Sequence, residues 1–225
     1  MDAASTTRDL MAVYGELDAM HAWRGWHWWP DADPFEVIVG AILVQNTAWA
    51  NVERALDRLR AADALTPEAM DALPELALEE LVRPSGQYRQ KAKKLRAVLA
   101  LAARHGGLAA LLALPPVTLR AELLATWGIG PETADAIVVY AAREPAFVID
   151  AYTMRLFSRL GAGPVTSRDY ATWQAFFTTH LPEDRDTWAR YHALIVMHCK
   201  HLCRKRAPLC QQCTLAARCP FAQGE

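Results

Sequence analysis

Near its C-terminal end this 225-residue chain holds four cysteines with the spacing Cys203-x6-Cys210-x2-Cys213-x5-Cys219. Four thiolates on one short loop can enclose an iron–sulfur cluster or a structural zinc ion, because both accept four sulfur ligands in a near-tetrahedral arrangement. Zinc sites usually pair their ligands as two short C-x2-4-C steps, whereas this loop has a single C-x2-C between longer gaps. The spacing therefore favours the cluster over zinc or four free thiols.

Composition indicates an ordinary globular protein, because about half of the residues are apolar and can bury a real core. No stretch approaches the ~18 uninterrupted apolar residues of a membrane span, and residues 1–5 lack the features of a signal peptide. We therefore expect a cytoplasmic protein without a membrane partner. Thiols stay reduced in the cytosol, so clustered cysteines indicate metal ligands and not disulfides. Cys199, the fifth cysteine, is expected to be a buried or spare thiol.

The net charge of −1 argues against a nucleic-acid binder, but the charges are unevenly distributed. Residues 146–225 hold ten Lys or Arg against six Asp or Glu, whereas residues 1–145 hold fourteen against nineteen. The acidic part contains one run of basic residues, which could be either a solvated helix face or a phosphate contact. That run consists of Arg89, Lys91, Lys93, Lys94 and Arg96.

Apolar residues recur at helical spacing along almost the whole chain, and no segment alternates as a strand does, which predicts an all-α protein. The segment 143–146 breaks this pattern where the charge balance changes sign, so we predict two lobes. Residues 34–145 would form a helical lobe inserted into a second lobe of residues 1–33 and 146–225. The predicted helices cover about 6–20, 34–46, 49–62, 75–82, 88–104, 116–126, 132–142, 151–160, 168–180 and 184–200.

A tight turn, Gly128-Ile129-Gly130, lies between two predicted helices, the second of which begins at or just after Pro131. Glycine allows positive φ and leaves the backbone bare, so amide hydrogens in the turn and at the helix N-terminus can donate hydrogen bonds to a phosphate. Taken alone, the pattern also fits an ordinary helical hairpin that uses glycine as a stop signal.

Asp150 stands where an apolar run ends and a helix is predicted to begin. An aspartate there can be an N-cap that satisfies free amide donors, and this role is compatible with catalysis. Apolar surroundings would raise its pKa and the helix N-terminus would lower it, so the sequence leaves the direction open.

The hairpin, Asp150 and the four-cysteine loop, in this order and at these intervals, resemble the endonuclease III-like branch of the helix-hairpin-helix DNA glycosylases. The resemblance extends from about residue 30 to Cys219. It implies two helical lobes with a cleft between them, a [4Fe–4S] cluster on the four cysteines, and excision of damaged bases from double-stranded DNA. It also implies a nucleoid-associated enzyme, which we expect to be a monomer.

In that family the aspartate matching Asp150 is essential, and a lysine matching Glu132 attacks the sugar in members that also cut the strand. This chain has no lysine between Gly106 and Cys199 that could replace it. A carboxylate cannot form the Schiff base that strand cleavage requires. The resemblance therefore implies a monofunctional enzyme, in which Asp150 stabilises an oxocarbenium-like sugar and orients or activates a water.

Five further segments, 28–30, 40–47, 82–86, 90–93 and 134–137, are similar to the 3-methyladenine DNA glycosylase III subgroup. In that subgroup a glutamate matches Glu132, and the aromatic residues of the base pocket match Trp28 or Trp29 and Trp49. The best-known form of the subgroup lacks the cysteine loop, so this chain departs from it toward the endonuclease III pattern. The candidate base-pocket residues are Trp28, Trp29, Pro30, Gln45 and Trp49.

Such a pocket suits an N-alkylated purine, which is cationic and already a good leaving group. A tryptophan face attracts a flat cation by ~0.5 to 2 kcal/mol beyond burial. Gln45 matches a residue that fills the gap left by the flipped base. The alternatives are that the tryptophans anchor the N-terminal segment to a core and that Gln45 simply ends a helix.

The four-cysteine loop is expected to fix Lys200, Arg204 and Lys205 against phosphate. The function predicted from sequence is monofunctional excision of alkylated purines such as 3-methyladenine in base excision repair. The nearest alternative is a glycosylase for oxidised pyrimidines or mismatched thymine on the same fold. A third is a DNA-binding iron–sulfur protein without glycosylase activity.

Overall fold

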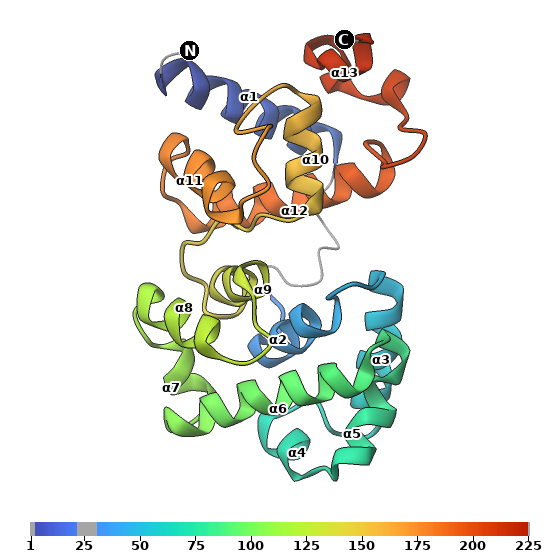
Figure 1. Cartoon of the computed structure of the whole chain (residues 1–225), viewed down its shortest axis with the longest axis vertical. Coiled ribbons are helices and arrows are strands. Elements are labelled where there is room, and N and C mark those ends of the chain that lie inside the picture. The colour runs from blue at the N-terminus through green and yellow to red at the C-terminus, as the bar shows by residue number, and fades with distance from the viewer. Residues whose placement is uncertain (1–2, 22–30, 225) are drawn as a thin grey trace. The chain divides into compact units, whose positions relative to one another are not determined.

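The computed structural model describes residues 3–21 and 31–224, and every regular element within these ranges is helical, which confirms the predicted all-α class (Figure 1). No helix in this part of the chain is both long enough and apolar enough to cross a membrane. The chain divides into two compact units: unit 1 is Met1–Trp26 with Pro145–Glu225, and unit 2 is His27–Glu144. The domain limits predicted from sequence, after residues 33 and 145, stay predictions.

Unit 1 is built around α12 (Arg185–His201), which is buried along most of its length. Phe147 stacks on Phe177 with ring centroids 4.3 Å apart, and the Tyr191 hydroxyl donates a 2.7 Å hydrogen bond to the carbonyl of Leu10. The hydrogen bond ties the first helix of the chain to the last long one. The other elements of unit 1 are α1 (Ala3–Met20), α10 (Ala151–Arg159), α11 (Tyr170–His180), α13 (Pro220–Gln223) and two 3-10 turns, η3 (Cys210–Gln212) and η4 (Thr214–Arg218).

Three helices of unit 1 begin with the same sequence pattern, an aspartate followed three residues later by a threonine. Asp150, Asp169 and Asp184 each accept a hydrogen bond from the backbone amide of that threonine, at the start of α10, α11 and α12 respectively. An N-cap of this kind stabilises a helix by about 1 kcal/mol.

In unit 2, α2 (Pro34–Leu43) buries eight of its ten residues. Asp33 caps it and Pro34 occupies its first turn, where a missing amide hydrogen costs little. Figure 1 shows α6 (Tyr88–Arg104) passing beside α2, α4 and α5, with which it packs. The remaining elements are α3 (Trp49–Ala61), α4 (Pro67–Ala72), α5 (Glu75–Val82), η1 (Arg83–Ser85), α7 (Leu108–Leu112), α8 (Pro116–Ala125), α9 (Pro131–Ala136) and η2 (Ile137–Ala141).

The helices differ from the sequence prediction in three places. The helix predicted over 34–46 ends at Leu43, and Asn46 takes a left-handed conformation with φ of 56°. The segment predicted as one helix over 132–142 continues past α9 as a π-helical turn. The helices α4 and α7 were not predicted, because elements of six and five residues are too short for helical periodicity to show.

Candidate functional site

Asp150 is both the N-cap of α10 and an almost buried carboxylate, with 11% of its side chain exposed. Its Oδ1 accepts hydrogen bonds from the Thr153 amide, at 2.7 Å, and from the Thr153 hydroxyl, at 2.9 Å. Its Oδ2 lies 3.7 Å from Nε2 of His192, on α12. The capping role proposed from sequence is therefore present, and the carboxylate has a neighbour that the sequence did not reveal.

The surroundings of Asp150 decide the direction of its pKa, which the sequence left open. Burial raises the pKa, but the His192 imidazole and the two hydrogen bonds from Thr153 outweigh it. The pKa of Asp150 therefore lies below its ordinary value, and the side chain is a carboxylate at neutral pH. A fixed negative charge of this kind can stabilise a developing cation.

The predicted hairpin is present in unit 2, where α8 and α9 are joined by the turn at 126–130. Gly128 has a φ of +82°, the left-handed conformation expected of a glycine in a tight turn. Ile129 is buried beneath the turn, whereas Gly128 and Gly130 are exposed. The two helices are tied together by Arg120 of α8, which donates to both carboxylate oxygens of the buried Asp135 of α9.

Side chains from two other segments of unit 2 pack against the hairpin. Gln45 donates through Nε2 to the hydroxyl of Thr133 at 2.9 Å and to the carbonyl of Gly128 at 3.4 Å. Lys94 of α6 donates to Oε1 of Gln45, and its aliphatic stem lies against Gly128, so closely that a Cβ there would stand 2.6 Å from Lys94 Cγ. The Gln45 side chain is thus held against the turn by three hydrogen bonds, so it does more than end a helix.

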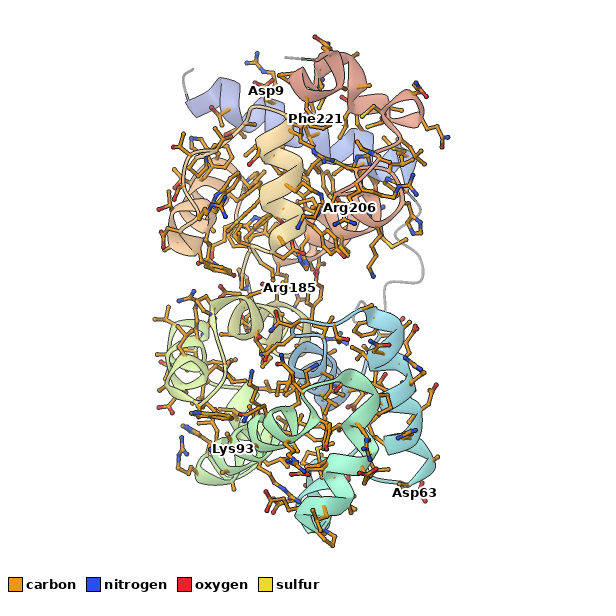
Figure 2. The ribbon with its side chains drawn as sticks, turned by 45° about the vertical axis from the view of Figure 1, so that its right-hand side comes forward. Asp9, Asp63, Lys93, Arg185, Arg206 and Phe221 are labelled. Carbon is orange, nitrogen blue, oxygen red and sulfur yellow. The ribbon has the colours of Figure 1, made fainter. Side chains whose placement is uncertain are left out.

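A second lysine flanks the turn. Lys93 Nζ lies 4.3 Å from the ring centroid of Trp127, and Trp127 is 47% exposed (Lys93 is labelled in Figure 2). Glu132 is also exposed, in the first turn of α9. The exposed side of the hairpin therefore carries two cations, an aromatic ring and a carboxylate.

The predicted base-pocket residues are only partly described. Trp49 is half-buried in the first turn of α3 and donates through Nε1 to Glu53 Oε1 at 3.0 Å. Trp28, Trp29 and Pro30 lie outside the described residues. Asp150 belongs to unit 1, whereas Gln45, Trp49, Glu132 and the hairpin belong to unit 2.

The four clustered cysteines of unit 1 line one cavity. Its wall also includes apolar side chains from α10 and the C-terminal segment, among them Leu156, Leu215 and Phe221. Cys199 is not part of this wall; it is buried, as expected, and its thiol lies 3.5 Å from the Tyr152 carbonyl. The cysteines that line the cavity are Cys203, Cys210, Cys213 and Cys219.

This arrangement can be compared with the needs of a zinc ion and of a cluster. Within residues 3–21 and 31–224, no three His, Cys, Asp or Glu side chains converge closely enough to hold one metal ion. Zinc would require all four sulfurs about 2.3 Å from one centre. Either group would draw its ligands from the four cysteines that line the cavity.

Arginines from α10 anchor the cysteine loop. Arg159 donates to the Cys203 sulfur at 3.1 Å and to the Arg204 carbonyl at 2.9 Å, and its guanidinium lies 4.2 Å from the ring centroid of Phe221 (Phe221 is labelled in Figure 2). The pKa of the Cys203 thiol is lowered, chiefly by a hydrogen bond from Cys199 and next by the one from Arg159. The lower pKa favours the thiolate, which is the form that binds metals. Lys200, Arg204 and Lys205 are exposed on and after the end of α12, and their predicted contacts with phosphate stay a prediction.

The sequence profile of the family described as "HhH-GPD superfamily base excision DNA repair protein" matches residues 39–174. The matched region includes the hairpin and Asp150. The chain belongs to this family. A putative DNA repair glycosylase of Methanocaldococcus jannaschii is 44% identical over 86% of this HhH-GPD chain and 88% of its own. The endonuclease III of Thermotoga maritima is 31% identical over 85% of this chain and 84% of its own length.

A solved structure is similar to this HhH-GPD protein as well. The 3-methyladenine DNA glycosylase of H. pylori bound to 1,N6-ethenoadenine is 29% identical, with a TM-score of 0.71, over 89% of this chain and 98% of the other. The family predicted from sequence is thus confirmed. The protein is a DNA glycosylase of base excision repair.

Sequence reasoning missed three of the side chains that define these sites. His192 and Thr153 surround Asp150, and Lys94 holds Gln45 against the turn. A threonine three residues after the aspartate is a capping signal that could have identified Thr153. A histidine within a buried helix carries no spacing that links it to Asp150.

Proposed function

We propose that this protein is a monofunctional DNA glycosylase that excises alkylated purines, such as 3-methyladenine, by hydrolysing the N-glycosidic bond. The observation that carries the proposal is Glu132, an exposed carboxylate in the first turn of α9, at the position where strand-cutting relatives would need an amine. The similarity to the H. pylori 3-methyladenine glycosylase supports the substrate class. The similarity to endonuclease III is the reason to test oxidised pyrimidines as the second candidate.

The reaction needs one negative charge near the sugar and one water. Asp150 supplies the charge, since it is ionised and fixed by Thr153. As the bond to the base breaks, positive charge develops at the sugar, and a preorganised carboxylate stabilises it without reorganising. The same carboxylate can accept a proton from the attacking water, so that the products are a free base and an abasic site.

The partner we propose is double-stranded DNA with a damaged base. The bare turn at Gly128 and Gly130 would receive a phosphate on its amide hydrogens, next to Lys93 and Lys94. Gln45 would enter the space left by an extruded base, and Trp49, with Trp28 and Trp29, would stack on that base. The exposed cations of the cysteine loop would add further phosphate contacts.

A lesion panel tests the substrate. Purified protein is given methylated duplex DNA, oxidised duplex DNA with thymine glycol, and a duplex with mismatched thymine, and the released bases are quantified. We expect release of 3-methyladenine and little from the other two. Release of thymine glycol or thymine without 3-methyladenine would select the second candidate. DNA binding without release of any base would select an inert DNA-binding protein.

We also propose that the four cysteines of the cavity hold a [4Fe–4S] cluster, which would supply a rigid clamp for the loop. Purified protein is expected to contain about four irons and four sulfides per chain. Cys210→Ala should lose the iron and the visible iron–sulfur absorption, whereas Cys199→Ala, outside the cavity wall, should keep both. About one zinc per chain, with no iron, would contradict the proposal.

The turn offers a further prediction. Gly128→Ala would place a Cβ 2.6 Å from Lys94 Cγ and strain a backbone with φ of +82°, so Lys94 must move away from Gln45. We expect DNA affinity to fall by about tenfold. Gly106→Ala is the matched control, because its φ is +85° but nothing lies within 4 Å of the added Cβ. It should lose similar stability, about 1 kcal/mol, and keep its DNA affinity. Equal DNA affinity of the two variants would contradict a role for the turn.

A further inference from the structure

The two oxygens of Asp150 have different neighbours, both within unit 1. Oδ1 accepts both hydrogen bonds from Thr153, which fixes the plane of the carboxylate. That plane directs Oδ2 toward Nε2 of His192, 3.7 Å away. The side chain of His192 is only 6% exposed, so little water reaches the space between them.

The separation of Asp150 and His192 is set by the packing of α10 against α12. His192 follows Tyr191, whose hydroxyl is bonded to α1, so α12 is fixed at this level. Farther along the two helices, Arg155 donates to the Cys199 carbonyl at 3.3 Å. The imidazole thus approaches the carboxylate because two rigid helices hold it there, not because a flexible surface side chain happens to reach it.

A carboxylate this deeply buried needs donors for both oxygens, because an unsolvated charge with an unsatisfied oxygen would take up a proton. Thr153 serves only Oδ1. At 3.7 Å, Nε2 is just beyond hydrogen-bond length, and catalytic hydrogen bonds are often long before the substrate binds. A small rotation of either side chain would close the remaining gap.

We propose that His192 is a positioning residue for the reaction, and that its Nε2–H holds Oδ2 of Asp150 so that the carboxylate stays charged and faces one fixed direction. The proposal rests on the role given to Asp150 under the proposed function. His192 would act only through Asp150 and would not touch the DNA. Its contribution should therefore appear in the rate of bond cleavage and not in DNA affinity.

Two amide variants test this proposal. His192→Gln can place an N–H close to the position of Nε2, whereas His192→Asn carries the same amide on a side chain one methylene shorter and cannot reach Oδ2. We expect the single-turnover rate of base release to stay within about threefold of wild type for the glutamine variant and to fall about 10- to 100-fold for the asparagine variant. Both should bind DNA like wild type. Equal rates for the two amides would overturn the proposal.

A double-mutant cycle on thermal unfolding tests the same contact without relying on activity. His192→Asn is combined with Asp150→Asn, and unfolding is followed for the four proteins. We expect His192→Asn to lower the unfolding midpoint when Asp150 is present and to have a much smaller effect when it is replaced. Equal effects in both backgrounds would overturn the contact. If the contact is found but wild type releases no base from any lesion, the proposed function fails and the positioning of Asp150 stands.

Discussion

Asp150→Asn is expected to slow base release by about a thousandfold while the protein folds and binds DNA as before. Asparagine keeps the oxygen that accepts from Thr153, so α10 keeps its N-cap. It loses the negative charge. Two unit charges about 4 Å apart attract each other by about 4 kcal/mol at an effective dielectric constant near 20, which corresponds to about three powers of ten in rate. Single-turnover assays on methylated duplex, with DNA affinity measured in parallel, check the result.

The matched control is Asp169→Asn. Asp169 caps α11 and accepts from the amide and the hydroxyl of Thr172 at 2.8 and 2.7 Å, the same local motif as at Asp150. It has no histidine neighbour among its hydrogen bonds and ion pairs in the described structure, and its cap is exposed. This variant should release base at the wild-type rate. A normal rate for Asp150→Asn would remove the enzymatic role of the carboxylate.

The sequence predicted the parts of the fold that local chemistry determines. A capping residue and a proline mark helix starts correctly at Asp150 and Pro34, because these residues act on the nearest turn only. Gly128 adopts the positive φ that the tight turn requires. Glycine disfavours helices, yet Gly40 lies inside α2, because burial of most of that helix outweighs the cost of one glycine.

The basic run on α6 shows what a linear pattern cannot resolve. Lys91 is 2% exposed and donates to the carbonyls of Leu43 and Ser85 inside unit 2, although it was grouped with solvated or phosphate-binding cations. Lys94 donates to Gln45 beside the turn, and Lys93 lies over the exposed ring of Trp127. Successive residues of a helix point to different sides, so one charged run can serve three purposes.

The sequence predicted the cysteine loop of the candidate site but not the neighbour of Asp150. The cysteine spacing placed four thiols on one loop, and they line one cavity, because short loops cannot carry their ends far apart. The partner of Asp150 was not predictable. His192 lies on a different helix, distant in sequence, and only the packing of α10 against α12 brings the two together.

Glu132→Lys is expected to give strand-cutting activity to the enzyme, which we propose to be monofunctional. A lysine there would offer an amine from the exposed first turn of α9, and an amine can form the Schiff base that β-elimination needs. Borohydride should trap a covalent protein–DNA adduct with this variant and none with wild type. The positive charge at a helix N-terminus would cost about 0.3 to 1 kcal/mol of stability.

Glu68→Lys is the control for that cost, since Glu68 also follows a proline in the first turn of a helix, α4, and is exposed. It makes the same change of charge at the same helical position but away from the hairpin. It should lose similar stability and form no adduct. A strong adduct with the wild-type protein would mean that another amine attacks the sugar, and the monofunctional assignment would fail. An adduct with Glu132→Lys alone would place residue 132 within reach of the anomeric carbon, because a Schiff base forms only where the amine can touch it.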